Sequence, residues 1–194
     1  VDCHEPHSAK ILQPGNALCM RCHTGTYPNS PIIDPPTHTH HKLNGEGGQC
    51  VNCHMPQTAY MQRDLRRDHG FTIPDPLLTK EHGIPNACNR CHTDKDTDWA
   101  IAAVEKWYGP RMNRPSRKRT QWIAKAREGA AGSRENLLQL LKEEKTPFWK
   151  AVATELLYPW AHDPEVTTTL LGNLSHTNAL LRGTTARAMD PVAR

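Results

Sequence analysis

Cysteine and histidine recur in a fixed pattern in the first half of the chain. Residues 19–23, 50–54 and 88–92 each read Cys-x-x-Cys-His. Two thiols at this spacing reach the two vinyl groups on one haem edge, and the next residue then supplies the proximal imidazole to the iron. The motifs predict covalent haem c on Cys19, Cys22, Cys50, Cys53, Cys88 and Cys91, with His23, His54 and His92 as proximal ligands. Zinc sites or disulfides also use paired cysteines, but they leave the histidine of every copy unexplained.

We interpret the start of the chain as a fourth, incomplete copy of the motif. The sequence opens Val1-Asp2-Cys3-His4, and one cysteine directly before Val1 would complete the pattern. Six of the 7 cysteines belong to complete motifs, so this interpretation also accounts for Cys3. The alternative is a free thiol that happens to precede a histidine. We expect Cys3 to be a thioether and His4 a proximal ligand, which gives about four haems.

Further histidines between the motifs are candidate distal ligands. They are numerous enough to close every iron with a second imidazole. We expect ligands among His7, His40, His41, His69 and His82, and the choice between His38, His40 and His41 stays open. His7 is too close to His4 to bind the same iron, so it suits a neighbouring haem. His162 and His176 are expected to be surface or helix-end residues.

Composition divides the chain in two. Residues 1–96 hold all 7 Cys, 10 of the 12 His and 10 of the 16 Pro, with one Phe. Side chains of this kind cannot fill an ordinary core, so haem must supply the apolar volume. The sequence contains no run of 18 apolar residues, so it does not predict a membrane span. A net charge of +4 without a binding motif does not indicate nucleic-acid binding.

After residue 96 the hydrophobic period changes to that of helices. We predict helices over about 97–108, 116–128, 134–144, 147–158, 164–174 and 178–189. Pro147 and Pro164 suit a first helical turn, and Asp163 is a good N-cap. The last four helices read as two copies of a hairpin about 30 residues apart, which favours a HEAT-like repeat, with a plain helical bundle as the alternative. The expected fold is mostly α: a loop-rich multihaem cytochrome domain over 1–96 and a helical repeat domain over 97–194.

Basic residues suggest contacts for acidic groups. Arg21, Arg63, Arg66, Arg67 and Arg90 lie near the motifs and could pair with haem propionates. Residues 111–127 contain seven Lys or Arg and no acid. That segment could be a docking patch, for haem propionates or for an acidic redox partner. The alternative is a solvated helix face.

The motif region resembles a known family. Residues 3–8 and 18–23 resemble the doubled Cys-x-x-Cys-His motif of multihaem c-type cytochromes. A second resemblance is to the haem region of larger bacterial cytochromes that carry tetratricopeptide or HEAT-type repeats after the haems. The segments that look like this region are residues 50–56, 60–61, 66–69, 85–88 and 107–109. The resemblance implies an exported electron carrier, periplasmic or extracellular, with mostly bis-histidine haems.

Electron transfer is therefore the expected function, between redox partner proteins such as other cytochromes. We expect a carrier rather than an enzyme. One alternative is a multihaem oxidoreductase of nitrogen or sulfur oxyanions, which needs one open iron. Another is a subunit of a polymeric extracellular conduit, a homo-oligomer or filament.

Overall fold

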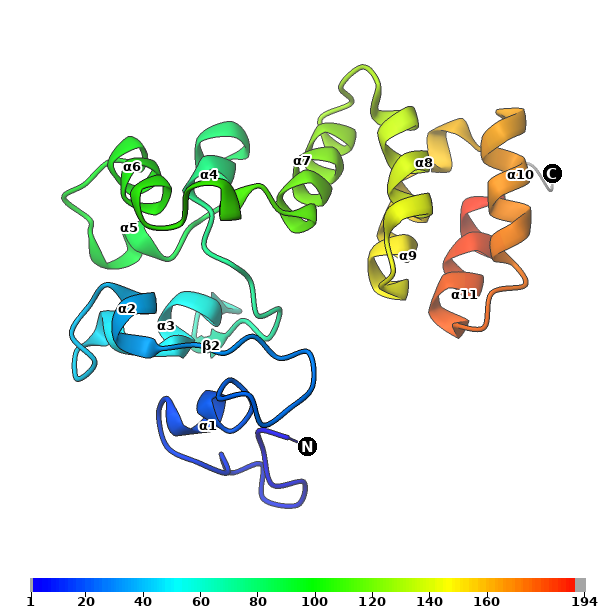
Figure 1. Cartoon of the computed structure of the whole chain (residues 1–194). Coiled ribbons are helices and arrows are strands. Elements are labelled where there is room, and N and C mark those ends of the chain that lie inside the picture. The colour runs from blue at the N-terminus through cyan, green and yellow to red at the C-terminus, as the bar shows by residue number, and fades with distance from the viewer. Residues whose placement is uncertain (1, 191–194) are drawn as a thin grey trace. The chain divides into compact units, whose positions relative to one another are not determined.

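The computed structural model describes residues 2–190 as two compact units (Figure 1). The first unit contains the residues up to Lys80 together with Ile84–Val104, and the second contains Glu81–Gly83 and the residues from Glu105 on. Helices dominate, and the described residues form a single two-stranded sheet. The predicted mostly α, loop-rich fold is confirmed.

Short helices joined by loops make up the first unit. They are α1 (Ala17–Met20), α2 (Pro35–Thr39), the 3-10 turn η1 (Glu46–Gly48), α3 (Cys50–His54), most of α4 (Pro76–His82), α5 (Cys88–Cys91) and the start of α6 (Thr97–Tyr108). Apart from α4 and α6, none of them exceeds five residues. Such helices are marginal by themselves, so contacts outside each helix must hold it in place.

A small hairpin follows α3. Strands β1 (Gln57–Tyr60) and β2 (Asp64–Arg67) pair antiparallel, with Gln57 opposite Arg67 and Tyr60 opposite Asp64. Met61 and Gln62 turn the chain with φ of 49° and 61°, which is the left-handed geometry of a tight hairpin turn. The sequence does not predict this hairpin, because neither turn residue is the usual Gly or Asn.

The second unit is a set of packed helices. Its elements are η2 (Gly109–Met112), α7 (Pro115–Arg127), α8 (Ser133–Glu143), α9 (Pro147–Leu156), η3 (Tyr158–Trp160), α10 (Pro164–Asn173) and α11 (Ala179–Ala188). These bounds confirm the predicted helices. The carboxylate of Asp163 accepts from the backbone N–H groups of Glu165 and Val166, at 3.0 and 3.2 Å, which confirms the predicted N-cap.

The helices of the second unit bury a core of aliphatic side chains. Leu137, Leu157, Val166 and Leu170 are each 0% exposed. Helix α8 packs against α7 and α9, and α11 packs against α9 and α10. The apolar stripes on these helices therefore stabilise this unit in the ordinary way, by burial.

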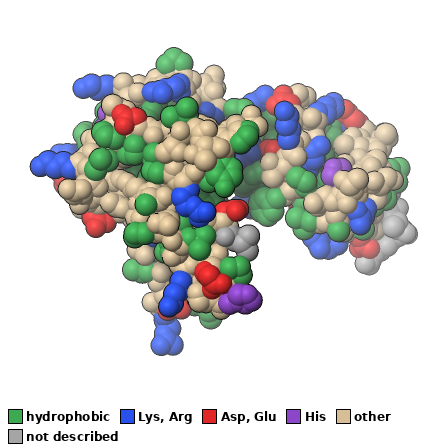
Figure 2. All heavy atoms as spheres, turned by 60° about the horizontal axis from the view of Figure 1, so that its bottom comes forward, with side chains coloured by type: hydrophobic (Ala, Val, Ile, Leu, Met, Phe, Trp, Pro, Cys, Tyr) green, Lys and Arg blue, Asp and Glu red, His purple; other side chains and the backbone are tan. Residues whose placement is uncertain are grey.

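The first unit buries few side chains of its own. Its buried apolar side chains among the described residues are Pro76, Leu78, Ala100 and Val104. Large apolar side chains are instead exposed: Ile11, Leu12, Tyr27, Ile32, Leu43, Tyr60, Met61, Leu65, Phe71, Ile73 and Ile84. Figure 2 shows hydrophobic side chains scattered over the face it draws. This exposed apolar surface agrees with the expectation that haem supplies apolar volume to this part of the chain.

No helix among residues 2–190 combines the length and apolar character needed to cross a membrane.

Candidate haem sites

Each complete Cys-x-x-Cys-His motif lies on one helical turn. In α3 both cysteines and His54 are helical. In the other two motifs, the backbone N–H of the histidine donates to the carbonyl of the first cysteine: His23 to Cys19 at 3.2 Å and His92 to Cys88 at 3.0 Å. Residues three apart share a helix face, so both thiols of a motif lie on one side, as attachment to one haem edge requires.

Three of the four histidines predicted as proximal ligands are oriented by a backbone carbonyl. Nδ1 of His4 donates to Ala9 at 2.8 Å, Nδ1 of His23 to Pro31 at 2.9 Å, and Nδ1 of His54 to Thr72 at 2.9 Å. A carbonyl only accepts, so the proton is on Nδ1 and Nε2 keeps its lone pair. This bond fixes the tautomer and ring orientation that a metal-ligating imidazole needs. The ring of His92 instead contacts Trp99, with ring centres 4.8 Å apart.

Imidazole rings lie near one another in three pairs. The ring centres of His4 and His69 are 6.4 Å apart, those of His38 and His54 are 6.1 Å apart, and those of His41 and His92 are 6.1 Å apart. Two imidazoles on opposite sides of a metal ion, each bound at about 2.0–2.1 Å, have ring centres about 6.3 Å apart. The spacing therefore fits an iron between the rings of each pair.

His69 is held by the hairpin. Its Nδ1 donates to the carbonyl of Arg67, at 2.9 Å, immediately after β2. The backbone N–H of Asp68 donates to Pro56 at 3.0 Å, so the pairing of the two strands continues up to this histidine. The hairpin, which the sequence does not predict, is thus the element that positions a predicted ligand.

The guanidinium group of Arg67 forms hydrogen bonds with other groups of the protein. Its Nη1 donates to the carbonyls of Val51 and Met55, both at 3.2 Å, and its Nη2 donates to Oδ1 of Asn52 at 3.0 Å. The Val51 carbonyl also accepts from the backbone N–H of Met55 at 2.9 Å, so Arg67 adds a second donor there and stabilises the C-terminal end of α3. Among the arginines considered for propionates, Arg67 is therefore occupied by the protein, and Nη1 of Arg21 donates to the carbonyl of Asp2 at 3.0 Å.

The cysteines of different motifs approach one another. A hydrogen bond from the Cys19 thiol lowers the pKa of Cys50 to about 7 and raises that of Cys19. Burial raises the pKa of Cys53, and the nearby Cys88 and Cys91 raise it further. All seven cysteines lie among the described residues, and none of them is in a disulfide. The cysteines of the three complete motifs thus lie close to one another.

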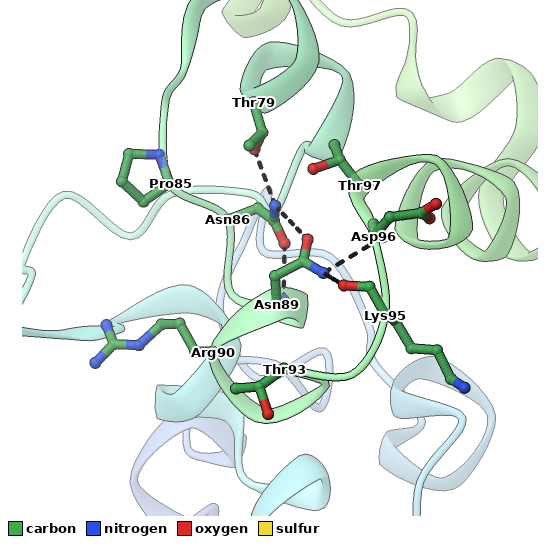
Figure 3. Close-up of a pocket in the computed structure, with 9 residues that line it drawn as sticks. All are labelled: Thr79, Pro85, Asn86, Asn89, Arg90, Thr93, Lys95, Asp96 and Thr97. Atoms are coloured by element: carbon green, nitrogen blue, oxygen red, sulfur yellow. Dashed lines mark hydrogen bonds between the residues drawn. The ribbon is translucent and has the colours of Figure 1, made fainter.

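A network of asparagines holds the third motif (Figure 3). Oδ1 of Asn86 accepts from the backbone N–H of Asn89 at 3.1 Å, and Nδ2 of Asn86 donates to Oγ1 of Thr79 at 2.9 Å. Nδ2 of Asn89 donates to the carbonyl of Lys95, also at 2.9 Å. These bonds tie α5 to the loops on both sides. We did not predict this role from the sequence, although an Asn just before a helix is a capping signal.

The other predicted ligands have different surroundings. His7 is exposed, and its backbone N–H donates to Glu5 at 3.1 Å. His40 has a left-handed backbone, with φ of 54°. The His82 side chain is 6% exposed and lies in the second unit, where Nδ1 is 3.1 Å from the Glu128 carboxylate. Nε2 of His82 is buried and has no hydrogen-bond partner among the described residues. These three assignments stay predictions.

The basic segment of α7 is partly used within the second unit. Lys118 pairs with Glu143 at 3.1 Å, and Arg119 pairs with Glu144 at 2.8 Å. Arg119 also lies over the ring of Trp149, 4.3 Å from its centre. Two of the seven basic residues thus stabilise helix packing.

Comparison with known proteins agrees with these sites. Residues 37–186 match the cytochrome c552 family, and this range contains the second and third complete motifs together with the candidate distal ligands His38, His40, His41, His69 and His82. No curated protein and no solved structure matches. The family match covers most of the chain and agrees with the thiols and oriented imidazoles described above. The chain therefore belongs to the cytochrome c552 family, and it is a c-type cytochrome that binds haem c covalently.

Proposed function

We propose that the chain is an electron carrier with about four haems, most of them bis-histidine. The thioether bonds are assigned to Cys3, Cys19, Cys22, Cys50, Cys53, Cys88 and Cys91, and the proximal ligands are His4, His23, His54 and His92. Distal ligands come from the histidines between the motifs. The observation that carries the proposal is the pair His4 and His69: both rings have Nδ1 bonded to a carbonyl, and their centres are 6.4 Å apart.

Haem iron supplies reversible uptake and release of one electron. The protein tunes the potential through its axial ligands, their hydrogen bonds and burial. The carbonyls of Ala9 and Arg67 orient the rings of His4 and His69 and raise the basicity of Nε2. Two imidazoles on one iron leave no position for a substrate, which suits transfer of electrons rather than reduction of a bound molecule.

A spectroscopic redox titration tests this function. A carrier takes up electrons reversibly, and carbon monoxide or nitrite leaves the spectrum of its bis-histidine haems unchanged. His69→Ala should then create one additional haem that binds carbon monoxide, while the haem count stays the same. Nitrite binding and turnover at one haem of the unaltered protein would contradict the carrier and support the multihaem oxidoreductase.

The finer assignments belong to the same proposal. We assign the haems to a domain over 1–96 and scaffold or docking to a helical domain over 97–194. The pairing of α8 with α9 and of α10 with α11, with α11 also against α9, supports a HEAT-like repeat. An exported, periplasmic or extracellular carrier would meet other cytochromes as partners. Assembly into a filament is the second candidate, and the mass of the assembled particle in solution distinguishes it from a monomer.

A further inference from the structure

The segment around α2 has three histidines within four residues, and the structure separates them. His38 is in α2, His40 ends that helix with left-handed φ, and His41 comes next. The ring centre of His38 lies 6.1 Å from that of His54, whereas the ring centre of His41 lies 6.1 Å from that of His92. We propose that this segment supplies the sixth ligand to two different irons, His38 to the haem on Cys50 and Cys53 and His41 to the haem on Cys88 and Cys91. This assignment rests on the proposed function.

The His38 ring is set by α2. This helix begins at Pro35, whose ring suits the first turn, and the hydroxyl of Thr37 donates to the Asp34 carboxylate at 2.7 Å. The planes of the His38 and His54 rings differ by only 13°. Nδ1 of His54 donates to Thr72, so the proton is on Nδ1 and the lone pair on Nε2 can bind a metal.

The turn at His40 redirects the chain. A left-handed residue ends a helix and changes the direction of the residues after it, so His41 does not continue the face on which His38 lies. Nδ1 of His41 donates to the carbonyl of Thr39 at 2.5 Å, which places the proton on Nδ1 and the lone pair on Nε2. The planes of His41 and His92 differ by 43°.

The arrangement makes these two haems neighbours. His38 and His41 are three residues apart, so their Cα atoms are at most about 11 Å apart. Electrons would then pass directly between the second and third complete motifs, and the short segment from 38 to 41 would fix the geometry of that step.

Alanine variants test how many irons lose their sixth ligand when a histidine is removed. The measurement is the number of haems per chain that bind carbon monoxide. His38→Ala and His41→Ala should each add one carbon-monoxide-binding haem per chain relative to the unaltered protein, and the double variant should add two. His162→Ala, at an exposed histidine of the second unit, is the control and should add none. His40→Ala tests the assignment itself and should also add none, because the proposal gives both ligand roles of this segment to His38 and His41. A double variant that adds only one, or a His40→Ala variant that adds one, would overturn the assignment. An unchanged haem count in each sample separates this result from failure of the proposed function.

Variants of a protein that lacks one haem identify which haem each histidine binds. Replacement of Cys50 and Cys53 by Ala removes one haem; there His38→Ala should add nothing, while His41→Ala still adds one. The opposite pattern would exchange the two assignments and refute ours. If alanine variants fold poorly, His38→Met and His41→Met keep six ligands, and each should raise the potential of one haem, because thioether ligation raises the potential. No change of potential in either Met variant would also refute the proposal.

Discussion

Replacement of Gly47 by Ala should loosen one haem ligand without touching a histidine. A Cβ at Gly47 would lie 2.3 Å from Cδ2 and 2.6 Å from Cγ of His41. Carbon atoms pack at about 3.5–4.0 Å, so the ring or the backbone must move by about 1 Å. An iron–imidazole bond cannot absorb a shift of that size. We therefore expect Gly47→Ala to convert part or all of one haem to a carbon-monoxide-binding form.

The same variant should also cost stability. Overpacking of this kind costs about 1–3 kcal/mol, which thermal unfolding of the haem-loaded protein measures. Gly45→Ala is the control, because its Cβ would lie 3.4 Å from the nearest atom, the carbonyl oxygen of Lys42. A Gly47→Ala protein with an unchanged spectrum and unchanged stability would show that His41 is not held against this glycine, and the argument for its ligand role would fail.

The hydrogen bonds of Arg67 and the ionised carboxylate of Glu144 give further predictions. Arg67→Met removes three hydrogen bonds at α3 and should destabilise the loaded protein by about 3 kcal/mol in denaturant unfolding. Arg66 is exposed, so Arg66→Met should have little effect, and equal losses in the two variants would refute the stabilising role of Arg67. Burial disfavours ionisation of Glu144, but the Thr146 N–H and Arg119 outweigh it and lower the pKa of this carboxyl. The folded pKa lies below the unfolded one, so the stabilisation is complete above the ordinary Glu pKa, about 4.3, and is lost as the pH falls through the folded value. Glu144→Gln should thus weaken amide protection of α8 and α9 by about 1 kcal/mol at pH 7 and by less in acid; a difference independent of pH would contradict this.

Local spacing determined which features the sequence could predict. The Cys-x-x-Cys-His motif fits within one helical turn, so its geometry follows from the sequence alone. The helices of the second unit follow a 3.6-residue period, and Asp163 and Pro147 mark where two of them begin. Both kinds of pattern depend only on residues close together in the chain.

Long-range contacts determined which features the sequence could not predict. Proximity in sequence does not assign His69 to an iron, and only the fold brings its ring opposite His4. The hairpin that carries His69 turns at Met61 and Gln62, which give no turn signal. Likewise, the spacing of His38 and His41 cannot show that they face different partners, because the left-handed turn at His40 separates them.

The number of haems on the intact chain tests the central claim most directly. The measurement is the mass of the haem-loaded protein, made with a cysteine directly before Val1 so that Cys3 has its partner. We predict four covalently bound haems per chain, one for each motif histidine. A mass with three or fewer in a fully loaded sample would contradict the account of the motifs on which the electron-carrier proposal depends.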